Sequence, residues 1–298
     1  MTDTATPDAA LGVSLLELIR STSCVLPADV VTTVAAGRAA ETAGSNAAYA
    51  LGVVCDNITM AKAKSQPLCQ DTGSILVYTN LPRGYDVHAF ETAFIAAVKQ
   101  ATKIGYLRQN SVDAVTGKNS GDNVGPGTPN FHHHQWDGDH VEIRLMLKGG
   151  GCENVGAQYS LPHPDLGGRD LKGVENAILD AVLKAQGQGC GPGILGVCIG
   201  GDRATGYGNS KEQLLRLIDD ANSDPVLGDL EKRVVDKANR SGIGPMGFGG
   251  ATTLLGCKIG KLNRVPASFF VSISYMCWAF RRQGVALDAA GGISRWLY

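Results

Sequence analysis

The sequence predicts an α+β fold, a single large domain over residues 1–298 with a helical N-terminal part and a mixed sheet. Helical composition dominates residues 13–65, and later apolar segments of strand length alternate with amphipathic segments of helix length. The 39 glycines stand in short runs, which indicates tight turns and close approaches of backbone to a ligand. No repeat and no long linker divides the chain.

The first half of the chain shows both helical and strand patterns. Apolar residues recur at helical spacing over 13–65 and 88–103, so helices are expected there. Strands are expected at 74–79 and 141–148, the second because apolar and charged residues alternate. Residues 109–130 hold many turn formers and have no periodic apolar face. A structureless loop of that length inside a compact domain is usually functional.

The second half repeats this alternation of helices and strands. Two of the expected strands begin or end beside a cysteine, so the predicted site lies at strand and loop ends. The expected helices are about 172–187, 210–221 and 225–239, and the expected strands are about 194–199, 252–260 and 268–276.

Charge and hydropathy exclude several classes of function. A formal charge of −1 gives no electrostatic basis for binding nucleic acid or an anionic membrane surface. Residues 1–12 lack the basic and apolar regions of a secretory signal, and the apolar stretch 267–280 is shorter than the roughly 20 residues that span a bilayer. We therefore expect a cytoplasmic protein, in which eight cysteines do not indicate a disulfide framework.

Three cysteines stand where a secondary-structure element begins or ends. Cys69 opens the segment Cys-Gln-Asp-Thr-Gly, Cys190 lies in Gly-Cys-Gly-Pro-Gly just before a strand, and Cys277 ends an apolar strand. Such positions allow the three thiols to converge on one site, and cysteine thiolates hold iron–sulfur clusters. Arg281 and Arg282 would favour the thiolate form of a nearby cysteine.

The other five cysteines carry less chemical information. There is no Cys-x-x-Cys, so the spacings of zinc ribbons and ferredoxins are absent. Cys152 follows three glycines and could line the site. Small buried apolar residues account for the rest, because free cysteine is among the most buried residue types. These are Cys24, Cys55, Cys198 and Cys257.

Four segments, in order along residues 45–284, resemble the class I iron–sulfur hydro-lyase family of fumarate hydratases and tartrate dehydratases, and specifically the α subunit of two-subunit members. The segments are Cys-Gln-Asp-Thr-Gly at 69–73, Lys-Gly-Gly-Gly at 148–151, Cys190 before Val-Cys-Ile-Gly-Gly at 197–201, and Gly-Ile-Gly-Pro at 242–245. The resemblance implies a [4Fe–4S] cluster held by Cys69, Cys190 and Cys277 with one iron open to substrate. It also implies a β subunit that completes the active site, in αβ pairs that dimerise.

Asp71 is the candidate for acid–base work or substrate orientation, because it lies two residues from a cluster ligand. The alternative is that Asp71 only caps a turn. The resemblance assigns substrate binding to Gln70, Arg108 and Gly150. An arginine fork suits a carboxylate, and glycine permits close approach to its N–H. A surface arginine and a plain tight turn are the alternatives for Arg108 and Gly150.

Two positions bear on the substrate. The family commonly has a histidine twelve residues before the third cluster cysteine, where this chain has Val265. The stretch Cys277-Trp278-Ala279 looks more like tartrate dehydratase α subunits than fumarases. The three adjacent histidines 132–134 do not predict a metal site, because neighbouring side chains of an extended segment point to opposite sides.

The hypothesis that follows is a hydro-lyase α subunit that converts L-tartrate to oxaloacetate, with the interconversion of fumarate and malate as the alternative. A second hypothesis, an electron-transfer iron–sulfur protein, requires a fourth cysteine ligand and no substrate arginine. A third is a binding subunit that kept the fold without activity, and Gln70, Asp71 and Arg108 argue against it.

Overall fold

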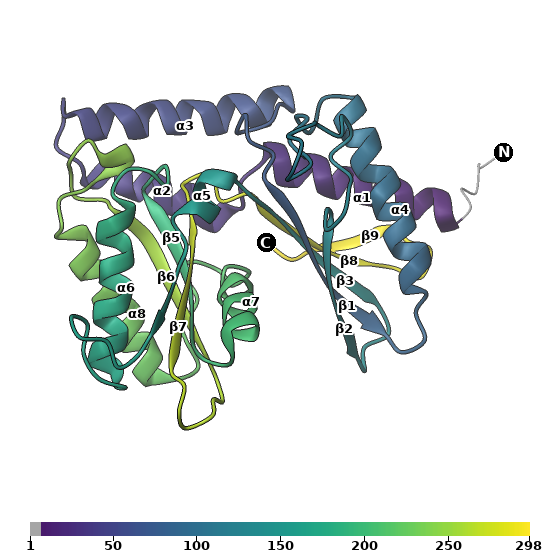
Figure 1. Cartoon of the computed structure of the whole chain (residues 1–298). Coiled ribbons are helices and arrows are strands. Elements are labelled where there is room, and N and C mark those ends of the chain that lie inside the picture. The colour runs from purple at the N-terminus through teal and green to yellow at the C-terminus, as the bar shows by residue number, and fades with distance from the viewer. Residues whose placement is uncertain (1–6) are drawn as a thin grey trace. The chain divides into compact units, whose positions relative to one another are not determined.

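The computed structural model describes residues 7–298, which form two compact units (Figure 1). Unit 1 combines the described residues up to Ala28 with Asn57–Gly149 and Arg281–Tyr298. Unit 2 combines Asp29–Asp56 with Gly150–Phe280. Both units mix helices with a sheet, so the α+β prediction is confirmed, while the one-domain organisation of residues 1–298 stays a prediction.

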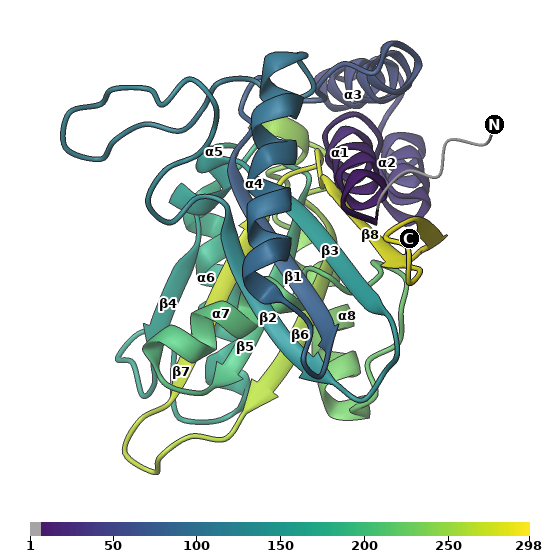
Figure 2. The ribbon, with the colours of Figure 1, turned by 90° about the vertical axis from the view of Figure 1, so that its right-hand side faces the viewer.

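Unit 1 is built on a five-stranded mixed sheet in the order β2-β1-β3-β8-β9. The β1–β2 pair is parallel and the other three pairs are antiparallel. Figure 2 shows α4 lying over the strands of this sheet. The elements are α1 (Pro7–Cys24), β1 (Ser74–Pro82), α4 (Val87–Lys103), β2 (Asn130–Trp136), β3 (Val141–Lys148), β8 (Arg282–Leu287) and β9 (Ile293–Trp296).

Alternation along the strands decides which face of this sheet the helices cover. Ile143, Leu145 and Leu147 of β3 project to one face, where they pack with Phe90 and Phe94 of α4. Burying each such side chain contributes roughly 1.5–3 kcal/mol. The intervening residues of β3 project to the other face, and they include polar side chains.

The strand ends next to the candidate site residues lie at one end of the unit 1 sheet. Ser74 at the start of β1 pairs with Lys148 at the end of β3, and Met146 pairs with Arg282 at the start of β8. The start of β1, the end of β3 and the start of β8 therefore lie side by side. The segments just outside these strands meet at that edge, including the loop that carries Cys69.

Unit 2 is built on a four-stranded mixed sheet in the order β4-β7-β5-β6. The β5–β6 pair is parallel, and β7 runs antiparallel to both β4 and β5. The strands are β4 (Ala157–Ser160), β5 (Gly193–Gly200), β6 (Leu254–Leu262) and β7 (Phe270–Met276), and the helices are α2 (Ala28–Ala40), the first part of α3 (Asn46–Lys64), α5 (Gly150–Asn154), α6 (Leu171–Ala185), α7 (Arg203–Gln213), α8 (Pro225–Asn239) and the 3₁₀ turn η1 (Pro245–Gly247).

Helices cover both faces of the unit 2 sheet (Figure 1). On one face α6 and α8 pack against Leu195 and Val197 of β5. On the other face α7 comes so close that a Cβ on Gly196 would lie 2.1 Å from the Ser210 carbonyl oxygen. A glycine at this strand position is therefore required for the approach of α7.

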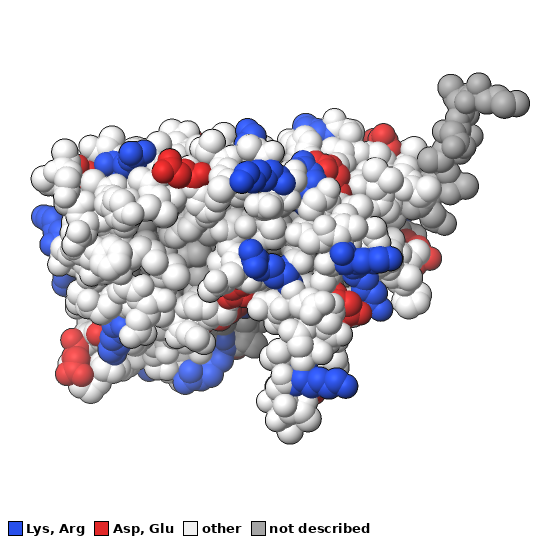
Figure 3. All heavy atoms as spheres, turned by 90° about the horizontal axis from the view of Figure 1, so that it is seen from above, with Lys and Arg blue, Asp and Glu red and all other residues white. Residues whose placement is uncertain are grey.

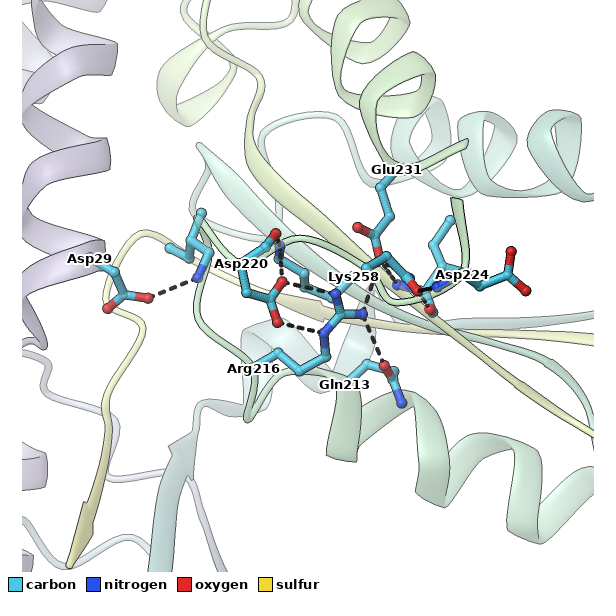
Figure 4. A network of polar contacts seen from close by, with 10 residues as sticks. Asp29, Gln213, Arg216, Asp220, Asp224, Glu231 and Lys258 are labelled. Atoms are coloured by element: carbon cyan, nitrogen blue, oxygen red, sulfur yellow. Dashed lines mark hydrogen bonds and ion pairs between the residues drawn. The ribbon is translucent and has the colours of Figure 1, made fainter. Parts of the chain in front are cut away.

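A charged network holds the α7–α8 connection of unit 2 to β6 (Figure 4). Arg216 donates to both carboxylate oxygens of Asp220 at 2.8 Å and to Glu231 at 3.0 Å. Lys258 Nζ donates to Asp220 Oδ1 at 2.6 Å. A hollow of about 440 Å³ lies beside the network. These charges are already matched with one another, so we interpret the network as structural.

The predicted helix at 210–221 is wrong in position. The structure places α7 at Arg203–Gln213, where Asp202 accepts hydrogen bonds from the N–H groups of Ala204 and Thr205 at the helix start. Two glycines inside this segment hid it in the sequence, because glycine disfavours helix interiors. The structure adds α5, β2, β4, β8 and β9, for which the sequence analysis named no element.

Residues 9–40 are long and apolar enough to cross a membrane by length and composition, although half of the most apolar window is buried inside the protein. The stretch consists of two helices, α1 and α2, and Leu15, Leu18 and Ile19 of α1 lie in the core of unit 1. Core packing therefore accounts for its hydropathy. The expectation that residues 1–12 are not a signal falls partly on residues 1–6, outside the described residues, and cytoplasmic location stays a prediction.

Charged side chains stand apart on the face shown in Figure 3, with lysines and arginines scattered among aspartates and glutamates. No patch of a single sign stands out on this face.

Candidate functional site

The Cys69 loop lies directly against the end of β3 in unit 1. Gly73 has φ +77°, and a Cβ at this position would stand 2.3 Å from the Lys148 carbonyl oxygen. Only glycine fits this contact and this backbone conformation. Within the loop, the Asp71 N–H donates to Cys69 Sγ at 3.4 Å.

Arg108 is held beside this loop by its backbone. The Thr72 hydroxyl donates to the Arg108 carbonyl at 2.7 Å and accepts from the Arg108 N–H at 3.0 Å. Asn123 Nδ2 donates to the same carbonyl at 2.8 Å. These hydrogen bonds fix the backbone of Arg108 and not its side chain, and the residue is exposed. Its guanidinium is therefore available to a carboxylate.

Asp71 contacts a residue that the sequence motifs do not assign to the site. Asn110 Nδ2 donates to Asp71 Oδ1 at 2.5 Å. The long loop expected at 109–130 thus returns to the Cys-Gln-Asp-Thr-Gly segment. Gly149 lies on the other side of Asp71, where a Cβ would stand 3.1 Å from Asp71 Oδ2. Gln70 is exposed in the same loop.

In unit 2, Cys190 and Cys277 lie at one end of the sheet. Ile194 near the start of β5 pairs with Met276 at the end of β7, and the Trp278 N–H donates to the Cys190 carbonyl at 3.5 Å. Cys190 is exposed and has φ +54°, a left-handed conformation that is unfavourable for a residue other than glycine. Strain of this kind clusters at functional sites.

Two glycines let the chain around Cys190 wrap over the ring of Tyr275. A Cβ on Gly189 would lie 2.4 Å from that ring, and a Cβ on Gly193 would lie 2.3 Å from it. The Gly-Cys-Gly-Pro-Gly pattern therefore has a steric cause: larger residues would push the Cys190 loop off the end of β7.

Burial raises the pKa of the Tyr275 phenol well above its usual range, and the nearby thiol groups of Cys277, Cys152 and Cys190 raise it further. All three cysteines thus lie near one phenol. Cys152, on α5, is 3% exposed. Its sequence context leaves its role open, and the structure groups it with Cys190 and Cys277.

The other cysteines lie in the interior or at its margin. Cys24, Cys198 and Cys257 are buried, and Cys55 is half-buried. Burial raises the pKa of the Cys198 thiol to about 12, so this thiol remains protonated at neutral pH. A protonated buried thiol packs as a small apolar residue.

The predicted site residues divide between the two units. Unit 1 brings Cys69, Gln70, Asp71 and Arg108 to one end of its sheet. Unit 2 carries Gly150 at the start of α5 together with Cys190 and Cys277. Within residues 7–298, no group of three or more His, Cys, Asp or Glu side chains is placed to hold a metal ion.

Val265 and the three histidines lie elsewhere. Val265 is 65% exposed and lines a hollow of about 640 Å³ in unit 2. His132 stacks on Tyr78 with ring centroids 4.6 Å apart, and His133 hydrogen-bonds Thr79 at 2.6 Å. These contacts give His132 and His133 packing roles in the sheet.

Comparison with known proteins gives a consistent result. Residues 13–286 match the family model described as fumarate hydratase (Fumerase). A putative fumarate hydratase class I from Geobacillus stearothermophilus is 50% identical over 290 residues, which are 96% of this chain and 56% of the relative. This chain thus spans little more than half the length of that protein.

Two shorter relatives match over most of their length. A putative L(+)-tartrate dehydratase subunit alpha from Methanocaldococcus jannaschii is 32% identical over 285 residues, covering 92% of this chain and 97% of the relative. The L(+)-tartrate dehydratase subunit alpha of Escherichia coli K12 is 30% identical over 269 residues, covering 89% and 86%.

Proposed function

The chain belongs to the fumarate hydratase (Fumerase) family, and we propose that it is the cluster-binding α part of a hydro-lyase acting on a four-carbon dicarboxylate. The observation that carries the proposal is the Cys69–Asp71–Arg108 arrangement in unit 1. There the Asp71 N–H donates to the candidate cluster thiol of Cys69, and the Thr72 hydroxyl holds the backbone of Arg108 beside the same loop.

Three thiols of this chain are the candidate ligands of a [4Fe–4S] cluster. Cys190 and Cys277 lie together at the end of the unit 2 sheet, and Cys190 is exposed in a strained conformation. Cys69 accepts a backbone N–H, as cluster-ligating sulfurs do. We propose these three as ligands, which leaves the fourth iron for substrate. When bound, the cluster would supply a Lewis acid that makes hydroxide a better leaving group.

The residues of this chain would orient the substrate and move its proton. Arg108 would bind one carboxylate through its guanidinium fork. Gln70 would donate to a substrate oxygen, and Gly150 would offer its backbone N–H. Asp71, held by Asn110, is the candidate to take a proton from the carbon beside the one that loses hydroxide.

Two substrates compete within this class. The stretch Cys277-Trp278-Ala279 favours L-tartrate, whose dehydration gives oxaloacetate. The 50% identity to a protein named putative fumarate hydratase favours fumarate and malate, against 30–32% for the tartrate dehydratase subunits. Identity over 290 residues is the broader observation, so we place fumarate and malate first and L-tartrate second.

A β part is needed in this proposal. Two of the relatives are named as alpha subunits, and the chain spans 56% of the longer relative. We propose that a β subunit completes the active site and that αβ pairs dimerise. Catalytic groups on that partner would then complement Asp71.

The test is an anaerobic substrate panel on the reconstituted chain with its β partner. We expect hydration of fumarate or dehydration of L-tartrate, together with visible cluster absorption that disappears in Cys69→Ser, Cys190→Ser and Cys277→Ser. Cys55→Ser is the matched control, because it removes a half-buried thiol outside the proposed ligand set. A Cys69→Ser protein with full cluster content and activity would disprove the assignment.

A further inference from the structure

Arg281 is a fully buried arginine at the end of the unit 1 sheet. Its residue is 1% exposed, and its Nε and Nη1 atoms have no hydrogen-bond partner among the described residues. Arginine cannot lose its charge in a protein, and leaving a buried charged donor unsatisfied is costly. Open donors on a buried cation therefore indicate a place for an anionic ligand.

Gly149 keeps a space open between this guanidinium and a carboxylate. A Cβ at Gly149 would stand 3.1 Å from Asp71 Oδ2 and 3.9 Å from Arg281 Nη2. Both groups thus approach the same point from different sides. Any side chain at this position would fill the space between them.

The positive charge at this end of the sheet also favours the binding of an anion. Lys148 and Arg282 are both 0% exposed, and both lie at the sheet end where Arg281 stands. Arg282 already packs over the ring of Tyr298, with its guanidinium carbon 4.4 Å from the centroid. Three buried basic residues thus lie at the sheet end that Asp71 adjoins, and two donor atoms of Arg281 have no partner among the described residues.

We propose that Arg281 binds a carboxylate of the dicarboxylate substrate across the space that Gly149 leaves open. This inference rests on the proposed function and gives the substrate's second carboxylate a partner, while Arg108 takes the first. A carboxylate held by Arg281 would place the adjacent carbon beside Asp71. Arg281 is then a substrate-binding residue that the motifs do not identify.

The experiment measures succinate binding to the full chain with its cluster, and the KM and kcat of the partnered enzyme. Succinate has both carboxylates but neither hydroxyl nor double bond, so it binds without reacting. The variants are Arg281→Lys, which keeps the charge and loses the fork, and Gly149→Ala, which fills the space. Gly151→Ala is the matched control, because its Cβ would meet only the Gln188 carbonyl at 3.9 Å.

We expect both variants to weaken succinate binding about tenfold or more and to raise KM, with cluster absorption and melting temperature unchanged, while the control binds normally. Acetate has only one carboxylate, so we expect it to bind the wild type too weakly to show a difference in affinity between the wild type and the variants. Unchanged succinate binding in both variants would overturn the inference. So would loss of cluster absorption in Arg281→Lys, which would show that the guanidinium holds the cluster. Succinate binding that depends on Arg281 in a chain without turnover would instead contradict the proposed reaction.

Discussion

Asn110 donates a hydrogen bond to the carboxylate of Asp71 at 2.5 Å, although the two residues are 39 positions apart in the sequence. This contact fixes the direction of a side chain that the Cys69 loop alone would leave to rotate. It also gives the long loop after α4 a role in positioning Asp71. The loop holds the candidate base rather than merely joining α4 to β2.

Asn110→Ala should lower kcat about tenfold to a hundredfold, because misplacement of a catalytic group by about 1 Å has an effect of that order. Cluster absorption and the free energy of unfolding should stay the same, because Asn110 is exposed. Steady-state kinetics of the partnered enzyme measure this. Lys118→Ala, in the same loop, serves as the control, and equal kcat in both variants would show that Asn110 does not position Asp71.

Gly193→Ala should destabilise unit 2 by about 1–3 kcal/mol, because its Cβ would lie 2.3 Å from the Tyr275 ring and force an overpacked site to shift. Denaturant unfolding of the full chain measures the change. Gly208→Ala in α7 is the matched control. Its Cβ meets nothing within 4 Å, so the helix should gain about 0.5–1 kcal/mol. Equal effects from the two substitutions would rule out the steric explanation.

Acid should weaken the network of Figure 4 through Asp220. Burial alone would raise the pKa of Asp220, but hydrogen bonds from Arg216 and Lys258 outweigh it and hold the pKa below its usual value. A lowered pKa in the folded state means that the ionised carboxylate stabilises the fold above the unfolded pKa of about 3.9. This stability is lost as the pH falls below about 4 through the folded pKa.

Asp220→Asn should therefore lose roughly 1–3 kcal/mol at pH 7 and show a weaker dependence on acid than the wild type. Unfolding curves at pH 7 and at about pH 3 measure both effects. The exposed neighbour Asp219 offers the control, since Asp219→Asn should leave both curves in place. A wild-type acid dependence that persists in full in Asp220→Asn would assign it to other carboxylates.

Glu41→Ala should detach the segment that precedes β6. The Glu41 carboxylate accepts hydrogen bonds from the N–H of Ala251 at 3.0 and 3.1 Å and from the N–H of Thr252 at 2.8 Å. Its loss leaves the buried N–H of Thr252 unsatisfied, which costs about 1–3 kcal/mol. Faster amide exchange at Thr252 in the variant, with wild-type exchange in the core of unit 1, is the expected result.

The sequence predicted the long, strongly periodic elements because their burial pattern is local. The alternation in 141–148 and the helical spacing in 88–103 both correspond to observed elements. The strands β8 and β9 were missed because β8 is buried at every residue and lacks alternation, and β9 is only Ile293–Trp296. The α7 segment was misplaced because its capping residues, rather than its apolar pattern, define where it begins.

The site, like the fold, could be predicted from the sequence only where neighbouring residues along the chain define it. Motifs within a few residues identified the Cys69 loop and Arg108. Asn110 and Arg281 were not assigned as site residues, because their roles depend on pairings between strands and loops far apart in the chain. A buried arginine with open donors becomes visible only once the neighbours of each atom are known.

The division of the chain between two discontinuous units has a consequence for biosynthesis. The unit 1 sheet takes its last two strands from Arg282–Leu287 and Ile293–Trp296, whereas its first strand begins at Ser74. The larger part of unit 2, Gly150–Phe280, is made between these segments. On the ribosome, the edge of β3 that pairs with β8 must therefore stay unpaired until residue 287 has emerged. Insertion of a cluster that depends on Cys277 would follow translation rather than accompany it, so the nascent protein would depend on protection until maturation is complete.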